Sequence, residues 1–144
     1  MSAQSAVSFP PQPEPDVDTE GFWRATAQGR LEMCRCQDCG LWHMPPLERC
    51  RVCGGATAFE SVAGTGTLYS FIIQHHPAIS GYLDHLPYAV GLVELDEQPG
   101  LRLPTRIVDV EMADIACGMR MQVRFEKLDG GDFVVPVFAP LEGA

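Results

Sequence analysis

The stretch CRCQDCGLWHMPPLERCRVCGG, residues 34–55, holds five of the chain's six cysteines. Four of them form two C-x-x-C pairs, Cys36 with Cys39 and Cys50 with Cys53, and a glycine follows each pair. A C-x-x-C turn brings both sulfurs toward one point, and the glycine can take a positive φ that turns backbone N–H groups toward the thiolates. Two such turns predict a tetrahedral four-cysteine zinc site, which is structural because it has no open position for water or substrate.

Two questions about the cysteines stay open at this point. Iron also accepts four thiolates from two such pairs, so a rubredoxin-like iron site is the alternative to zinc. Cys34 is too close to Cys36 to form a further turn of the same kind, and we expect it to be a strand residue that points to the other side of the hairpin. Cys117 is expected to be a small buried apolar residue in a helical turn, not a nucleophile.

Length and composition indicate a soluble cytoplasmic protein. The 144 residues suffice for a small metal-stapled module and one compact domain. No window approaches the roughly 18 apolar residues of a membrane helix, and the N-terminus does not resemble a secretory signal. In a reducing cytoplasm, clustered cysteines favour metal binding over disulfides.

The pattern along the chain is mainly β and divides into four parts. Residues 1–18 are acidic and rich in proline, which predicts a disordered tail. Residues 19–33 predict a short helix and an extended lead-in, residues 34–60 the zinc ribbon, and residues 61–144 a five-stranded OB-fold barrel. The five expected strands lie within 66–76, 88–95, 101–110, 120–128 and 132–138, with a helical turn at 111–119. Pro104 and Pro136 suggest edge positions or bulges, and Gly64, Gly66 and Gly91 suit sharp bends.

Two other classes of function are weaker. The net charge is −9, and the barrel has five basic residues against eleven acids from Asp84 to Glu142. A stand-alone OB-fold that binds single-stranded nucleic acid needs a basic groove with stacking aromatics, so this alternative ranks well behind. A stand-alone enzyme ranks last, because none of the four histidines stands in a recognised nucleophile motif and we find no catalytic residues; these histidines are His43, His75, His76 and His85.

Several segments together resemble a bacterial and archaeal family of zinc-ribbon plus OB-fold proteins that accompany thiolases. They are GFWRATAQGRLEMCRCQDCG, PPLERCRVCGG, GTGTLYSF, PYAVGLVELDE and GMRMQVRFEKLDGGDFVVPVF, and the match spans about residues 20–140. The resemblance implies a non-catalytic subunit of a hetero-oligomer that binds a thiolase-superfamily protein, such as a thiolase, a steroid side-chain aldolase or an acyltransferase. The two proteins would share an acyl-CoA site, with neither nucleic acid nor membrane involved.

The resemblance also suggests which surface meets the partner. The family places the N-terminal helix beside its enzyme, so Phe22 and Trp23 are candidate partner contacts, although aromatics there can equally cover this protein's own core. Arg35, Arg49 and Arg51 are candidates for attracting the phosphates of CoA. The sequence departs from the family pattern at Cys34 and at the LPTR stretch, residues 103–106, and neither departure involves the four ligands.

Overall fold

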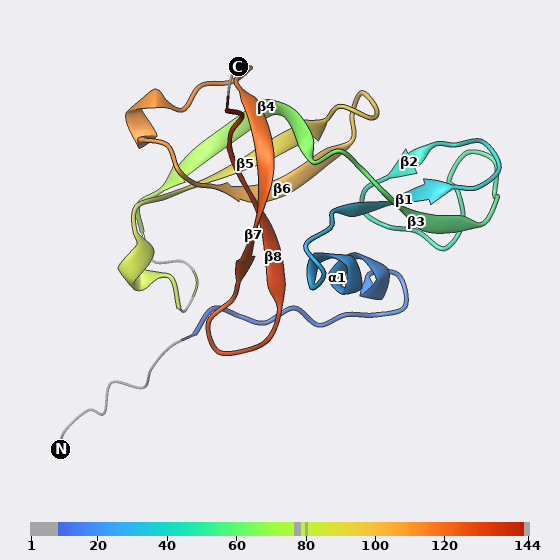
Figure 1. Ribbon diagram of the computed structural model, residues 1–144, viewed down its shortest axis with the longest axis horizontal. Helices are drawn as coiled ribbons and strands as arrows, with labels where there is room; N and C mark the ends of the chain where they lie inside the picture. The colour runs from blue at the N-terminus through green and yellow to red at the C-terminus, as the bar shows by residue number, and fades with distance from the viewer. Residues whose placement is uncertain (1–8, 77–78, 80, 143–144) are drawn as a thin grey trace.

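The computed structural model, which describes residues 9–76, 79 and 81–142, confirms a mainly β chain with an N-terminal helix, a ribbon and a barrel (Figure 1). The helix α1 (Glu20–Thr26) precedes three ribbon strands: β1 (Glu32–Cys36), β2 (Trp42–His43) and β3 (Thr57–Ser61). The barrel strands are β4 (Thr65–Gln74), β5 (Tyr88–Leu95), β6 (Arg102–Ile107), β7 (Arg120–Lys127) and β8 (Val134–Pro140). Two 3₁₀ turns are η1 (Leu83–His85) and η2 (Met112–Asp114). Among these described residues, no helix is long and apolar enough to cross a bilayer.

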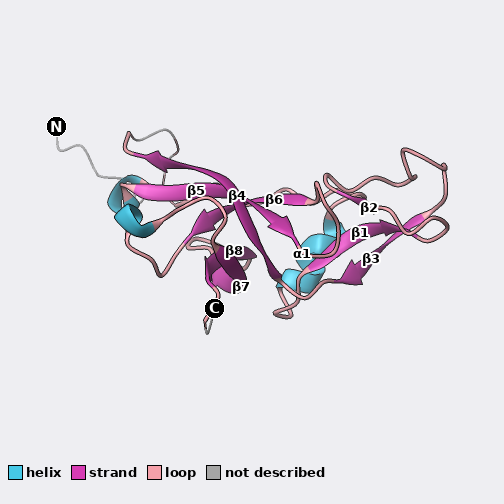
Figure 2. Cartoon of the chain, turned by 90° about the horizontal axis from the view of Figure 1, so that it is seen from above, coloured by secondary structure: helices cyan, strands magenta, loops and turns pink. Residues whose placement is uncertain are grey.

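The ribbon is an antiparallel sheet in the order β2-β1-β3. It lies beside the barrel, and α1 lies between the two (Figure 2). Gly21 lets the helix approach β3 closely, because a Cβ at this position would collide with the ring of Phe59. The helix ends before Gly29, whose φ of 73° is a left-handed conformation that favours glycine.

The barrel closes in the order β4-β5-β6-β8-β7, and along β5 buried residues alternate with partly exposed ones. Its interior is filled by apolar side chains, of which Val93, Met121 and Phe138 are fully buried. Leu31, Met33 and Trp42 of the ribbon segment belong to the same core cluster. Ribbon and barrel therefore share one hydrophobic core.

The turn between β5 and β6 also joins the ribbon to the barrel. The side-chain amide of Gln98 donates to the carbonyl of Trp42 at 3.1 Å and accepts from the Trp42 amide at 3.0 Å. In the same turn, Asp96 pairs with Arg120 of β7 at 2.6 Å and accepts from the Thr65 hydroxyl of β4 at 2.7 Å. The hydrogen bond from Arg120 and then that from Thr65 hold the pKa of Asp96 down at about 2, so this carboxylate stays charged.

The seam between β6 and β8 is the weakest join of the barrel. These strands run parallel and are paired at Ile107 and Phe138, whereas antiparallel ladders join the other neighbours. Pro104 of β6 and Pro136 of β8 lie on the two strands that flank this seam, which agrees with the edge positions that the sequence predicts.

Part of the segment expected to be a disordered tail has a defined course. Residues 9–15 form an extended segment, which we name the strap, that passes beside the loop between β7 and β8 on its way to α1 (Figure 1). Pro10 is buried, and Gln12 donates through Nε2 to the carbonyl of Asp129 at 3.0 Å. Composition alone suggested disorder, but contacts with distant barrel loops order the strap. Of the rest of the expected tail, residues 16–18 lead into α1, and residues 1–8 lie outside the described residues.

Substitution of Gly66 tests the close packing of the barrel. A Cβ at Gly66 would collide with the backbone carbonyl of Glu94 on β5, whereas one at Gly91 would meet chiefly the flexible ends of Leu68 and Ile107, each under 3 Å away. We expect Gly66→Ala to lower the free energy of unfolding by about 1–3 kcal/mol, and more than Gly91→Ala does. Urea denaturation of the two variants measures both values. Equal stability of Gly66→Ala and the parent chain would contradict this account.

Candidate metal centre

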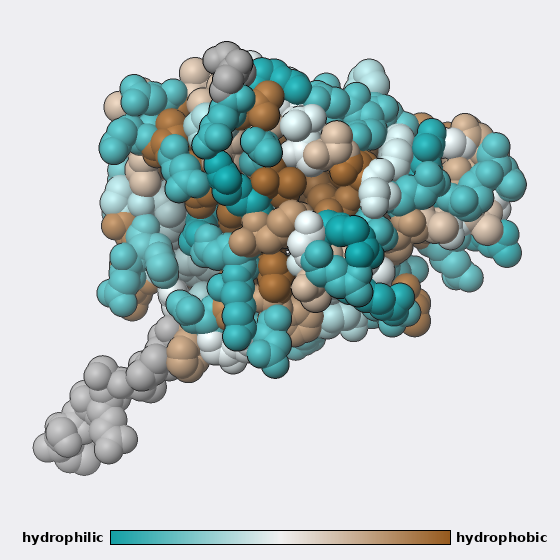
Figure 3. Space-filling model, viewed as in Figure 1, coloured by the Kyte–Doolittle hydropathy of each residue, from teal (hydrophilic) through white to brown (hydrophobic). Residues whose placement is uncertain are grey.

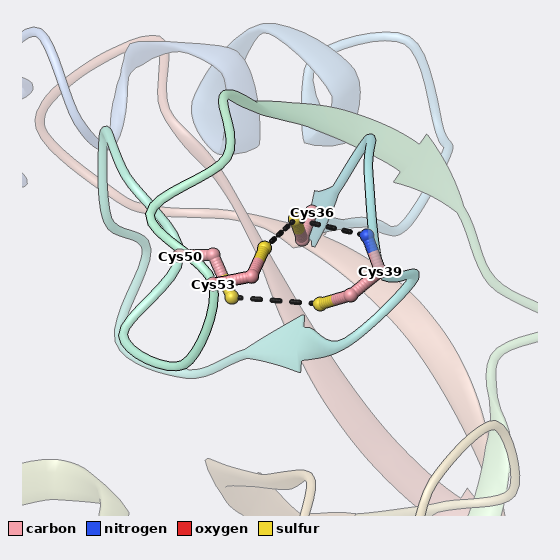
Figure 4. A group of neighbouring side chains, drawn as sticks. All are labelled: Cys36, Cys39, Cys50 and Cys53. Atoms are coloured by element: carbon pink, nitrogen blue, oxygen red, sulfur yellow. Dashed lines mark hydrogen bonds between the residues drawn. The ribbon is translucent and has the colours of Figure 1, made fainter.

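The four cysteines of the two C-x-x-C pairs converge at the end of the ribbon (Figure 4). Their Sγ atoms all lie within 4.8 Å of one another; Cys36 and Cys53 are 3.4 Å apart, and Cys39 and Cys50 are 3.6 Å apart. Bonds of about 2.3 Å to a tetrahedral zinc would place the sulfurs about 3.8 Å from one another. The arrangement therefore suits structural zinc.

The backbone around each pair takes the conformation that the spacing predicts. Gly40 and Gly54 have φ values of 79° and 73°. Backbone amides point at the sulfurs at 3.4 Å: Asp38 and Cys39 donate to Cys36, Val52 to Cys50, and Gly55 to Cys53. These donors stabilise negative sulfur, which is the form that binds metal.

The four thiols differ in how readily they ionise. The amide of Cys39 lowers the pKa of the Cys36 thiol to about 6. The Gly55 amide acts in the same direction on Cys53, but the neighbouring sulfurs of Cys36 and Cys39, together with burial, raise the pKa of Cys53 to about 12. A divalent cation at the centre removes this conflict because it attracts all four thiolates at once.

Cys34 lies outside this cluster, but the reason differs from the predicted one. Cys34 and Cys36 are two residues apart on β1, so their side chains share a face instead of pointing to opposite sides. The Sγ of Cys34 is buried and donates to the carbonyl of Leu47 at 3.4 Å. Cys34 thus lies on the same face of β1 as Cys36, two residues away from the cluster of four cysteines.

His43 is a buried residue whose position sequence reasoning missed. It pairs with Cys34 across the β1–β2 ladder and is 0% exposed. Its Nδ1 lies 3.2 Å from the guanidinium of Arg51, and its Nε2 has no partner among the residues that the structure describes. Burial, and then the charge of Arg51, lowers the pKa of His43, so the imidazole is neutral. The sequence did offer one indication of its burial, which is the position of His43 between the two C-x-x-C pairs.

The ribbon arginines take part in contacts within the chain. Arg35 stacks on the ring of Trp42, with its guanidinium carbon 4.7 Å from the ring centroid, and donates to the carbonyl of Gly40 at 2.9 Å. It also pairs with Glu60 at 3.5 Å. Arg51 contacts His43, as described above. These contacts leave Arg35 and Arg51 less free to attract phosphate than their sequence positions suggested.

Cys117 and the remaining histidines lie on exposed segments at separate places in the described chain. Cys117 is exposed, so the expectation of a buried residue was wrong: η2 ends at Asp114, and Cys117 falls in the surface turn that follows. His75 and His76 directly follow β4, and His85 ends η1. Within the described ranges, the four cysteines are the one group of three or more His, Cys, Asp or Glu side chains close enough to hold a metal ion.

Phe22 and Trp23 contact the barrel side of this chain. The ring of Trp23 packs edge-on against Phe22, with centroids 4.9 Å apart, and against Phe133, with centroids 5.8 Å apart. Both residues are half-buried and line a pocket between α1 and the barrel. Part of their surface thus serves internal packing, and their contact with a partner stays a prediction.

Comparison with known proteins places these features in a family. Residues 23–60 match the ChsH2 rubredoxin-like zinc ribbon domain, and residues 60–126 match the ChsH2 C-terminal OB-fold domain. The chain belongs to the ChsH2-type DUF35 family. A solved structure described as the Ltp2-ChsH2(DUF35) aldolase contains a chain that is 34% identical, with a TM-score of 0.80, over 90% of this chain and 98% of that one.

Two curated relatives differ in length. A probable enoyl-CoA hydratase alpha subunit of Thermomonospora curvata is 34% identical over 97% of this chain and 43% of its own length. The chain thus spans less than half of that relative. A DUF35 domain-containing scaffold protein of Methanothermobacter thermautotrophicus is 29% identical over 83% of this chain and 91% of its own length. The family resemblance predicted from the sequence is confirmed.

We expect one zinc ion per chain, bound by Cys36, Cys39, Cys50 and Cys53. A Cys50→Ala, Cys53→Ala double variant should lose the metal and unfold the ribbon, because structural zinc contributes on the order of 10 kcal/mol to small metal modules. Elemental analysis of the purified proteins measures the metal. Cys34→Ala is the matched control and should retain zinc. Stoichiometric iron in the parent chain, or full zinc in the double variant, would contradict the assignment.

Proposed function

We propose that this chain is a non-catalytic accessory subunit that binds a thiolase-like partner in the cytoplasm and helps to form its acyl-CoA site. The partner would carry out the thiolysis, retro-aldol cleavage or acyl transfer. The observation that carries the proposal is the match over nearly the whole length of a chain in a structure whose description names two components, Ltp2 and ChsH2. The scaffold relative, which the match covers almost end to end, supports the same role.

The chemistry of the metal centre supports a subunit without its own active site. All four positions around the metal would be taken by cysteine, so zinc there could not activate water or polarise a thioester. The neutral, buried His43 has no route to a substrate because none of its surface is exposed. A catalytic cysteine, histidine or tyrosine would therefore come from the partner.

The barrel surface does not favour the nucleic-acid alternative. Each basic residue of the barrel contacts an acid at 4 Å or less; the pairs are Arg102–Glu94, Arg106–Glu126, Arg120–Asp96, Arg124–Asp109, Arg124–Glu142 and Lys127–Asp132. A phosphate backbone binds proteins by exchanging its counterions for Lys and Arg charges. Paired cations on a chain of net charge −9 offer few such charges.

Reconstitution tests the accessory role. The purified chain alone should release no CoA from acyl-CoA substrates, and it should raise the activity or the soluble yield of the thiolase-like protein that copurifies with it. CoA release, followed with a thiol reagent, measures the first quantity for each protein alone and for the mixture. Thioester cleavage by the chain alone that survives repurification would overturn the proposal. So would a partner whose rate and solubility are the same with and without this chain.

Trp23 tests whether α1 contacts the partner. Trp23→Ala should weaken the complex, and it should also lower the melting temperature because it removes the packing on Phe133. Phe133→Ala is the matched control: it removes the same internal contact and leaves Trp23 in place. We expect Phe133→Ala to lower the melting temperature but to change the dissociation constant of the complex much less than Trp23→Ala does. Equal weakening by both variants would mean that Trp23 serves internal packing alone. Calorimetry of the complex and thermal melts of the free chain measure the two quantities.

A further inference from the structure

A pocket of about 530 Å³ lies along the seam between β6 and β8. Leu103, Val135 and Val137 line it from the barrel, and Phe22 and Trp23 line it from α1. On this face of the molecule, hydrophobic residues gather in the region between the barrel and α1 (Figure 3). The volume falls in the range of about 300–1,000 Å³ that is typical of small-molecule sites, which are also mostly apolar.

The arginine on the polar side of the pocket is already paired with a carboxylate. Arg106 contacts both carboxylate oxygens of Glu126, at 2.6 and 2.5 Å. Tyr82 and His85 also line the pocket, and burial raises the pKa of the Tyr82 phenol, which keeps it a neutral hydrogen-bonding group. Lys127 also lines the pocket, beside Asp129, and it is paired with Asp132 at 3.7 Å. An anion would have to displace Glu126 from Arg106 or Asp132 from Lys127 in a chain of net charge −9. The lining thus favours an uncharged ligand with an apolar body and a terminal hydrogen-bonding oxygen.

The strap forms one wall of this pocket through residues 10–13. The first residues of the strap are held between two loops, and each loop has a glycine at the point of contact with the strap. A Cβ at Gly81 would collide with the backbone of Phe9 and Pro10, and a Cβ at Gly130 would lie 2.5 Å from the ring of Phe9. At the other end, the carboxylate of Asp16 accepts from the amide and the hydroxyl of Thr19, just before α1. The strap thus spans the pocket between two anchored ends.

Between these ends, few polar contacts hold the strap. Four of its seven residues are prolines, which have no N–H to donate, and among the described residues no backbone–backbone hydrogen bond joins residues 9–15 to the barrel. Gln12 supplies the hydrogen bond to Asp129, while its own Oε1 is buried and has no partner within the described ranges. Lifting the middle of the strap, residues 11–14, would lose one hydrogen bond and would expose that oxygen to water, while the buried Pro10 stays at the anchored end, so the polar cost of opening is small.

We propose that this pocket binds an uncharged, largely apolar small molecule and that the strap is its gate. The site belongs to this chain by itself, so the proposal does not rest on the accessory role. A strap anchored at both ends and weakly held between them can lift without unfolding the barrel, because the core of the barrel lies on the other side of β6 and β8. Ligand entry would then be limited by the opening of the strap.

A reversible cross-link tests the gate in the full chain. Gly131 has no positive φ, and a Cβ there would lie 3.5 Å from Cγ of Gln12, so Gln12→Cys with Gly131→Cys places two thiols within reach of a disulfide. Cys117→Ser removes the exposed thiol outside the metal centre. Nile red, an uncharged polycyclic ketone whose fluorescence rises in apolar surroundings, is the probe. Stopped-flow fluorescence should show association at least about tenfold slower in the oxidised protein than in the same protein after reduction.

A point variant tests the gate without a cross-link. Gln12→Ala removes the hydrogen bond to Asp129 and should speed Nile red association about fivefold, the effect of losing one ordinary hydrogen bond. Gln74→Ala is the matched control, because its amide also donates to a carbonyl, that of His76, at 2.7 Å but away from the strap. This control should bind the probe at the parent rate. Val135→Arg places a charge in the pocket and should abolish saturable binding, while Ile72→Arg, on an exposed side chain of β4, should not.

Each remaining outcome overturns part or all of the proposal. Equal association rates in the oxidised and reduced cross-linked protein, or in Gln12→Ala and the parent, mean that the strap is a fixed wall. Binding that survives Val135→Arg means that the probe occupies another surface. If neither the parent nor Gln12→Ala binds Nile red saturably, the pocket is not a ligand site. Thermal melts of each variant confirm that the fold is retained.

Discussion

Four sulfurs within 4.8 Å of one another are the constraint on which the ribbon depends. Its three strands are short, and the turns that carry the cysteines are largely exposed, so little apolar surface is buried at that end. A cation that accepts four thiolates replaces a hydrophobic core there. Two turns must direct four sulfurs at one metal position. The positive φ values of Gly40 and Gly54 and the backbone amides that point at the sulfurs follow from this requirement.

The other end of the ribbon depends on the barrel. Leu31, Met33 and Trp42 complete the barrel's core, and Gln98 bonds both polar groups of the Trp42 backbone, as a neighbouring strand would. The turn that holds Gln98 also ties β4 to β7 through Asp96. The metal centre therefore orders one end of the ribbon, and the barrel orders the other. The orientation of α1, which lies between ribbon and barrel, depends on both.

The sequence predicted those features that local patterns determine. Cysteine spacing predicted which four sulfurs converge, and alternating apolar residues predicted the barrel strands, because both patterns reflect contacts along one element or between neighbours. The strap was missed because its acidic, proline-rich composition is typical of disorder and its order comes from loops more than 60 residues away, at Gly81 and Gly130. Cys117 was misplaced because burial in a turn depends on which side of the turn meets the core.

The pair of prolines beside the seam has a consequence for self-association. A barrel that closes poorly leaves strand edges with unsatisfied N–H and C=O groups, and such edges can recruit strands from other molecules. Pro104 and Pro136 remove a donor from each of the two strands that flank the gap, so an incoming strand would meet an interrupted ladder. The barrel can thus keep a seam with little strand pairing and still resist growth into an intermolecular sheet.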